Sequence, residues 1–431
     1  MRFGVARDLV TPTVRTHMGG YGSLFGRYFT AIHDDLYVKA LVLDDGRCKA
    51  LLMTYDLLMH SFDLTERLAD YARQEHGVPR ENVLVSYTHN HAGPAIEGYD
   101  PGQSSPEYEA FLIDRSRACV DRAFVNLIEG SARFGTVSGD WNINRRARVG
   151  GKMVNAPNHA GNTDRELNIL RFSDGDGECQ ALLLNYACHP VTLADTLWIS
   201  SEYPGRLCQL LEARYYGCTA LFFQGAGATF RPLVSAASAS WKRCSFDEVD
   251  GMAAAMATSV QSVVQADQLV PFELKLAGST FVVHLETQVQ PKTFFEQLLE
   301  QSGHAPHLQG RLRVILENYD RTDNTVPVHG GIVRLGVDLW MAWLCGEVCY
   351  EVKEEIAKVF AGTKLVFVGY GDGVAYIPDD KLIGEGGYEV DGAVVEFCLK
   401  GRFKRGVTRK LVDAYREALG RHRTGNASRD R

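Results

Sequence analysis

Short apolar runs alternate with helical patterns along most of the chain, and this alternation restricts the fold more than any other feature. Strands are expected near Tyr37 to Leu43, Ala50 to Tyr55, Asn82 to Tyr87, Ala181 to Tyr186, Ala220 to Phe223, Gly331 to Leu335 and Lys364 to Val368, with a further extended segment from Lys275 to Gln290. Helices are expected near Leu64 to Gln74, Glu107 to Leu127, Arg206 to Tyr215, Val249 to Val264 and Thr293 to Asn318. Strands that alternate with helices predict an α/β fold, and we expect a layered α/β sandwich with a mixed central sheet.

The charge balance excludes two classes of partner. The formal net charge is −7, whereas proteins that bind nucleic acid or anionic membranes carry basic patches. The sequence has no run of about 18 apolar residues, so no membrane-spanning helix is expected. The segment from Met1 to Asp8 lacks the apolar core and cleavage site of a secretory signal, which predicts a cytoplasmic protein with reduced, scattered cysteines.

Three histidines follow apolar runs that are typical of buried strands. His89 and His91 come shortly after the run Val83 to Val85, in the segment Thr-His-Asn-His-Ala-Gly-Pro. Alternate residues of an extended segment point the same way, so both rings can face one volume, and imidazole is the commonest metal ligand in proteins. His189 also follows an apolar run and precedes a proline. The repeated placement predicts a metal site, although each ring alone fits a buried histidine bonded to backbone.

A metal site of this kind needs a carboxylate from elsewhere, because His-x-His comes here without cysteine ligands or a helical His-Glu-x-x-His motif. Glu347 is the best candidate. It closes the apolar run that starts at Val337 and precedes a helical pattern from Tyr350 to Phe360, which places it at a strand-to-helix turn. The alternative is a surface glutamate near the start of that helix.

Several further motifs occur in order along the chain. They are Met18 to Gly22, Ile32 to Asp34, Ala40 to Gly46, Thr88 to Pro94, Asn142 to Arg145 and Gly346 to Glu347. Together they resemble the catalytic N-terminal domain of the neutral/alkaline non-lysosomal ceramidase family, and the ordered set is more specific than any one motif. The resemblance covers about residues 1–420 and implies one ceramidase-like zinc hydrolase domain, followed by a polar tail over 421–431.

The resemblance also implies a set of metal ligands. In that family a zinc ion is held by two histidines, a glutamate and a tyrosine, which correspond here to His89, His189, Glu347 and Tyr376. Tyr376 lies in the segment Val-Ala-Tyr-Ile-Pro, where a tyrosine that is often present earlier in the family's motif is replaced by Gly373. Zinc polarises a carbonyl and lowers the pKa of bound water to about 7, so cleavage of an amide or ester is the expected chemistry.

Other residues match positions near the reacting carbonyl. His91 can shuttle a proton, whereas Arg145 keeps its charge and can stabilise an oxyanion or bind a substrate carboxylate. Tyr388 matches a further pocket position. Without the resemblance, Arg145 equally fits a structural ion pair, and Tyr376 and Tyr388 fit core packing with a bonded hydroxyl.

One departure from the family concerns Arg231. It stands in the segment Gln224 to Pro232, at the position of a serine that contributes to catalysis in true ceramidases. A permanent positive charge there disfavours a purely lipidic amide and suits an acidic or polar substrate, unless the side chain turns out to solvent.

These observations predict a zinc-dependent hydrolase of a small amide, lactam or ester that is not a true ceramidase. The expected partner is a small-molecule substrate, acidic or polar in character, while a homo-oligomer stays open. Two alternatives also stay open. The same site can run an amide-forming acyl transfer, because one tetrahedral intermediate serves both directions. A non-catalytic binding protein with a closed zinc site would differ from an enzyme in lacking an open coordination position.

Overall fold

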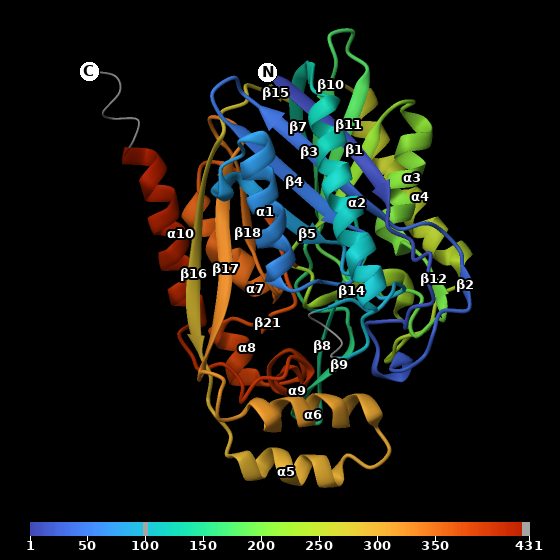
Figure 1. The fold of residues 1–431 in the computed structure, drawn as a ribbon, viewed down its shortest axis with the longest axis vertical. Coiled ribbons are helices and arrows are strands. Elements are labelled where there is room, and N and C mark those ends of the chain that lie inside the picture. The colour runs from blue at the N-terminus through green and yellow to red at the C-terminus, as the bar shows by residue number, and fades with distance from the viewer. Residues whose placement is uncertain (98–101, 425–431) are drawn as a thin grey trace.

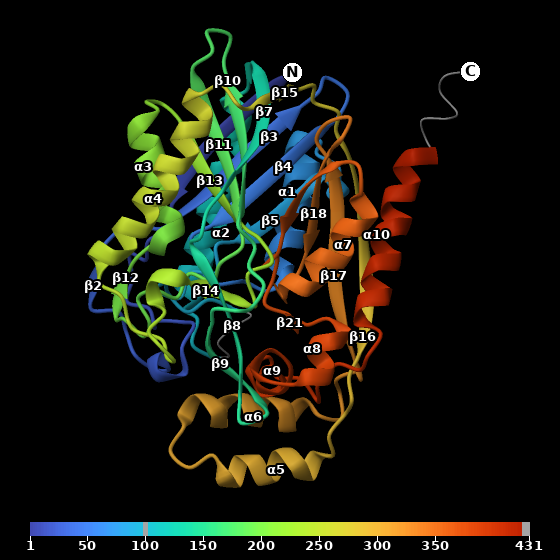
Figure 2. The same cartoon turned by 180° about the vertical axis from the view of Figure 1, so that it is seen from behind.

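Within residues 1–97 and 102–424, which the computed structural model describes, three large β-sheets form the interior and helices cover their outer faces (Figures 1 and 2). All three sheets are mixed, since each has one parallel pair among antiparallel ones. The layered α/β fold that the alternation of strands and helices predicts is therefore confirmed.

The first sheet has the order β5-β4-β3-β1-β6. Its strands are β1 (Arg2–Leu9), β3 (Tyr37–Asp44), β4 (Lys49–Tyr55), β5 (Val83–Tyr87) and β6 (Ile128–Glu129). Helices α1 (Phe62–His76) and α2 (Pro106–Val125) pack on its outer face through a shared apolar cluster. Helix α1 ends at Gly77, whose left-handed backbone (φ 68°) is the usual way to close a helix.

The second sheet has the order β13-β11-β10-β7-β15. Its strands are β7 (Ser131–Ser138), β10 (Glu166–Ser173), β11 (Cys179–Tyr186), β13 (Thr219–Gln224) and β15 (Val270–Phe272). Helices α3 (Glu202–Arg214) and α4 (Phe246–Gln265) cover it. Helix α4 begins with a capping box, in which the Ser245 side chain accepts from the backbone of Glu248 and the Glu248 side chain accepts from Ser245.

The third sheet has the order β16-β17-β18-β20. Its strands are β16 (Ala277–Glu286), β17 (Thr325–Arg334), β18 (Leu339–Leu344) and β20 (Lys364–Val368). Helices α7 (Tyr350–Ala357) and α10 (Val407–Thr424) cover its outer face. Helix α10 extends past residue 420, and the rest of the expected tail, 425–431, lies outside the described residues.

One apolar cluster joins the inner faces of the three sheets. It contains Phe3 and Leu52 from the first sheet, Phe172 from the second, and Met341 and Val366 from the third. The inner faces of these strands pack in this cluster and helices cover their outer faces, so both faces are apolar. This explains why the strands appear in the sequence as continuous hydrophobic runs.

Smaller elements surround one end of this core. They are β2 (Ala31–Ile32) with β12 (Trp198–Ile199), β8 (Asn142–Val149) with β9 (Lys152–Asn158) and β14 (Phe230–Pro232), β19 (Glu347–Val348) with β21 (Tyr376–Ile377), and helices α8 (Asp380–Glu385) and α9 (Ala393–Glu396).

A helical hairpin forms the lower end of Figure 1. It consists of α5 (Lys292–Gln301) and α6 (Pro306–Asn318), so the single helix expected from Thr293 to Asn318 is two helices. Pro306 cannot continue a helix from the preceding turn but is well suited to begin one. In the part of the chain that the structure describes, no helix is both long and apolar enough to cross a membrane.

Candidate metal centre

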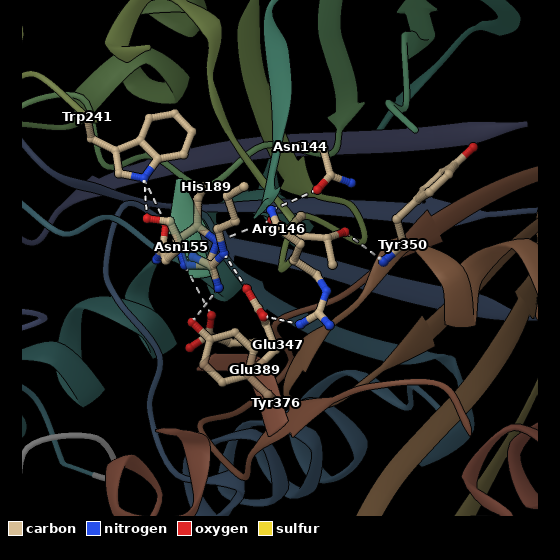
Figure 3. Close-up of polar contacts among 12 residues, drawn as sticks. Asn144, Arg146, Asn155, His189, Trp241, Glu347, Tyr350, Tyr376 and Glu389 are labelled. Carbon is tan, nitrogen blue, oxygen red and sulfur yellow. Dashed lines mark hydrogen bonds and ion pairs between the residues drawn. The ribbon is translucent and has the colours of Figure 1, made fainter. Parts of the chain in front are cut away.

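His89, His189 and Glu347 each lie just beyond the carboxyl end of a strand, and each comes from a different large sheet. They follow β5, β11 and β18, respectively. Each of these strands has a parallel neighbour, β4, β13 and β20. Loops at the carboxyl ends of parallel strands commonly form binding sites, and here three such edges converge. The structure thus brings together side chains that are far apart in the sequence. Figure 3 shows His189 beside Glu347.

The backbone at these strand ends is strained. His89 (φ 64°) and Tyr370 (φ 58°), which follows β20, both adopt the left-handed conformation. For a residue other than glycine this costs on the order of 1–3 kcal/mol, and such strain gathers at functional sites. Gly346 (φ 86°) turns the chain directly before Glu347, and a Cβ there would lie 2.5 Å from the Ala375 carbonyl oxygen.

The donor atoms of four side chains converge. The Nε2 atoms of His89 and His91 lie 3.0 Å apart. Oε2 of Glu347 lies 3.4 Å from Nε2 of His89 and 3.1 Å from Nε2 of His189. The three imidazoles form a group whose ring nitrogens could bind one metal ion. All four side chains are buried.

Backbone carbonyls hold the other nitrogen of each ring. Nδ1 of His89 lies 3.3 Å from Leu58 O, Nδ1 of His91 lies 2.9 Å from Gly20 O, and Nδ1 of His189 lies 3.2 Å from Gly227 O. A carbonyl only accepts hydrogen bonds, so each Nδ1 carries the proton in a neutral ring, and each Nε2 presents a lone pair. Histidine ligands of metals are oriented in this way.

The charges of these groups agree with that assignment. Burial lowers the pKa of His91 well below its usual range, and burial together with the nearby Arg145 lowers the pKa of His189 to about 3. Burial alone would raise the pKa of Glu347, and it is positive charge on the neighbouring His89 and His189 that holds this pKa well below its usual range. With the rings neutral, an ionised Glu347 therefore needs another cation beside it.

Glu347 provides the test of whether a metal ion fits. Neither of its carboxylate oxygens has a hydrogen-bond partner of suitable geometry among the described residues, although Oε2 lies close to two imidazole nitrogens. Those nitrogens present lone pairs, which repel a carboxylate. A buried, unpaired carboxylate is costly unless a cation balances it. Two or three imidazole nitrogens with one carboxylate oxygen are a suitable donor set for Zn²⁺.

Arg145 joins this group to a second layer. Its Nη2 donates to the phenol oxygen of Tyr376 (3.0 Å), and its Nε donates to Glu389 (2.9 Å). The guanidinium lies 5.4 Å from the ring centroid of Tyr376 and 5.5 Å from that of Tyr388. Tyr376 is paired in register with Glu347 between β19 and β21, so the two side chains project on the same side. Tyr388 is 37% exposed and lies between these groups and solvent.

Arg231 has its own contacts, although its charge lies near enough to Arg145 for the two to interact. Its Nη2 donates to Val191 O (3.3 Å), and its guanidinium lies 4.5 Å from the ring centroid of Trp241. Burial lowers the pKa of Arg231 from its usual value. The side chain is thus held against an aromatic ring and a carbonyl.

Three residues that the sequence analysis did not single out contribute to the centre. Tyr370 places its hydroxyl 3.3 Å from Nδ1 of His189, Glu389 binds Arg145, and Gly20 supplies the carbonyl for His91. Tyr370 follows a strand end in the same way as the histidines. A search for polar side chains just after apolar runs could therefore have found it. Gly20 lies within the motif Met18 to Gly22 and Glu389 follows Tyr388, but neither residue carries a signal of its own.

Comparisons with known proteins agree with this architecture. No protein-family model matches the chain. Two solved structures are similar in fold: neutral ceramidase from Pseudomonas aeruginosa (TM-score 0.75, 16% identity, 97% of this chain and 73% of that chain) and a ceramidase complexed with C2 (TM-score 0.76, 16% identity, 97% and 75%). The chain has a neutral ceramidase-like fold.

The ceramidase comparison corrects one prediction. We expected from Arg231 that the chain is not a true ceramidase, but the solved structures that share its ceramidase-like fold over 97% of the chain are themselves ceramidases. The physical reason is that Arg231 is held against Trp241 and Val191 O. One charged residue held in this way is not sufficient to exclude a ceramide substrate.

Proposed function

We propose that this protein is a metal-dependent hydrolase that cleaves the amide bond of an N-acylated amine, with ceramide-type lipids as the first substrates to test. The observation that carries the proposal is the approach of Nε2 of His89 and Nε2 of His189 to the buried, unpaired carboxylate of Glu347, with Nε2 of His91 beside that of His89. The ceramidase-like fold over 97% of the chain supports the choice of reaction.

His89, His189, Glu347 and Tyr376 would hold the ion, and zinc is our first choice because the donors are imidazole nitrogens and oxygens. When bound, such an ion polarises a substrate carbonyl and makes water a better nucleophile near neutral pH. Arg145 supports Tyr376 in this role, because its Nη2 donates to the phenol oxygen and holds it in place.

The remaining residues would act on the substrate directly. His91 is buried and neutral, and Gly20 O fixes its Nδ1, so its Nε2 is the atom that can accept a proton and return it to the leaving amine. Arg145 keeps its charge and can stabilise the negative oxygen that develops as the carbonyl is attacked. The partly exposed ring of Tyr388 would contact the entering substrate.

The proposal is tested with purified protein that has been treated with a chelator and then reloaded with Zn²⁺. Release of amine is measured from a short-chain ceramide and from an acidic N-acyl amino acid. We expect hydrolysis only after reloading, and a loss of about 100-fold in His189→Ala, because ligand loss removes the ion.

His329→Ala is the matched control, since the half-buried ring of His329 stacks on Phe62 and is not one of the grouped histidines His89, His91 and His189. It should retain activity. Cleavage that is equally fast without metal, or in His189→Ala, would contradict the proposal, as would a reloaded protein that cleaves neither amide.

A further inference from the structure

Two arginines that are adjacent in the sequence reach the same carboxylate. Consecutive side chains of a regular strand point to opposite faces, yet Arg145 and Arg146 both bind Glu389. The pairing of β8 with β9 explains this, because the register shifts between Asn144 and Arg146. The Asn144 side chain accepts from the backbone N–H of Arg146 (2.8 Å), which stabilises the irregularity. A bulge of this kind re-aims a side chain.

Glu389 divides its two oxygens between the two guanidinium groups. Oε1 accepts from Nε of Arg145 (2.9 Å), and Oε2 accepts from Nη1 of Arg146 (2.5 Å). The side chain of Glu389 is only 2% exposed, and those of both arginines only 4%. Arg146 has further acceptors in Glu385 (3.3 Å) and Gly386 O (2.9 Å), so it does not depend on Glu389 alone.

The bond to Glu389 determines where the other end of Arg145 points. A guanidinium is a rigid plane, so fixing Nε fixes the direction of the Nη groups. Nη2 of Arg145 donates to the phenol oxygen of Tyr376. Tyr376 in turn lies beside Glu347 on paired strands. Hydrogen bonds therefore link Glu389 through Arg145 to Tyr376, and strand pairing places Tyr376 next to Glu347, which lies beside His89 and His189.

We propose that Glu389 is a positioning residue for the metal centre, because it fixes Arg145 and thereby holds the phenol oxygen of Tyr376 where it can bind the ion. This inference rests on the proposed function, since it assumes that Tyr376 is a ligand. It assigns Glu389 no contact with substrate or ion.

The test measures Co²⁺ binding to chelator-treated full-length protein, followed by the visible absorption of Co²⁺ and by equilibrium dialysis. Glu389→Gln keeps the size of the side chain and removes its charge, so Arg145 can turn away from Tyr376. We expect Co²⁺ affinity to fall by about tenfold or more, as for other residues that orient a ligand, with a changed Co²⁺ spectrum. In Zn²⁺-loaded protein, kcat should fall more than KM changes.

Glu385→Gln is the matched control, because Glu385 binds Arg146 but makes no contact with Arg145. It should bind Co²⁺ within about twofold of the unmodified chain. A Glu389→Gln protein that binds Co²⁺ with unchanged affinity and spectrum would overturn the inference, and so would an equal loss in Glu385→Gln.

A double-mutant cycle decides whether Glu389 acts through Arg145. Arg145→Gln and the double variant Arg145→Gln/Glu389→Gln should have the same Co²⁺ affinity, whereas a further loss in the double variant would overturn the inference. The comparison of Arg145→Gln with the double variant can still be made if Glu389→Gln alone fails to fold.

A chain that binds Co²⁺ but cleaves no amide would refute the proposed function while the Co²⁺ comparison still stands. A chain that binds no Co²⁺ would refute both.

Discussion

His89 and His91 turn their Nε2 atoms toward each other at a distance of 3.0 Å, although a regular extended segment would direct the two rings in parallel. The left-handed backbone of His89 makes this arrangement possible. Two imidazoles that face each other through lone pairs repel, and a proton or a cation on one of the two Nε2 atoms relieves the repulsion. Burial lowers the pKa of His91, which disfavours a proton there, so a cation on Nε2 of His89 is the better way to relieve it.

Removal of metal should therefore destabilise the protein. An ion present at 100 times its dissociation constant stabilises the folded state by about 2.7 kcal/mol. We expect a chelator to lower the melting temperature by a few degrees, and re-addition of Zn²⁺ to restore it. His189→Ala should melt at the same temperature with and without chelator. A chelator effect of equal size in that variant would indicate that the ion binds elsewhere.

The Gly20 carbonyl predicts a specific sensitivity to substitution. A Cβ at Gly20 would lie 2.8 Å from Nδ1 of His91, so Gly20→Ala must displace the ring. Gly26 has a similar left-handed backbone (φ 72° against 90°), but nothing lies within 4 Å of its added Cβ. Both variants should lose about 1–2 kcal/mol of stability from backbone strain. Only Gly20→Ala should also lose most of its amidase activity, and equal activities in the two variants would contradict the role of His91.

The hydroxyl of Tyr370 should contribute modestly to metal affinity. It lies 3.3 Å from Nδ1 of His189, which retains Gly227 O as a partner. We expect Tyr370→Phe to weaken Zn²⁺ binding by up to about tenfold. Tyr87→Phe is the control, because the Tyr87 hydroxyl is buried without a hydrogen-bond partner among the described residues. Its removal should be neutral or stabilising. Isothermal titration of both variants with Zn²⁺ makes the comparison.

Glu202 should make stability depend on pH. It is 1% exposed and accepts from the Leu193 backbone (2.9 Å) and the Thr192 hydroxyl, and burial raises its pKa from 4.5 to about 7. Between these values the folded state binds a proton that the unfolded state does not, so the contribution of Glu202 to stability falls as pH rises from about 5 to 7. The free energy of unfolding should fall by about 1.4 kcal/mol per pH unit at most because of Glu202.

Glu202→Gln cannot titrate and should lack this contribution. Denaturant unfolding at pH 5, 6 and 7 should therefore show the variant gaining stability relative to the unmodified chain as the pH rises. A constant difference across this range would show that Glu202 titrates alike in both states.

The positions of the principal side chains were accessible from the sequence because one rule places them. His89, His189 and Glu347 all follow apolar runs, and the structure shows those runs as β5, β11 and β18. Apolar periodicity locates strand ends well. Their convergence has a topological cause, since each strand has a parallel neighbour in its own sheet and the three edges meet. The assignment of ligands among these side chains stays a prediction.

Other features depend on tertiary structure and leave no local pattern. The bulge beside Asn144 aims Arg145 and Arg146 at one carboxylate, and no periodicity predicts it. The direction of Arg231 depends on Trp241, which packs against it from a separate loop, and no local sequence pattern predicts that contact. The break between α5 and α6 had a visible signal in Pro306, which the apolar pattern outweighed.

The wide separation of the proposed ligands along the chain has a consequence for synthesis. His89 leaves the ribosome long before Glu347 and Tyr376. A nascent chain that stops between them holds only part of the proposed donor set, so the full set can assemble only after Tyr376 has been synthesised.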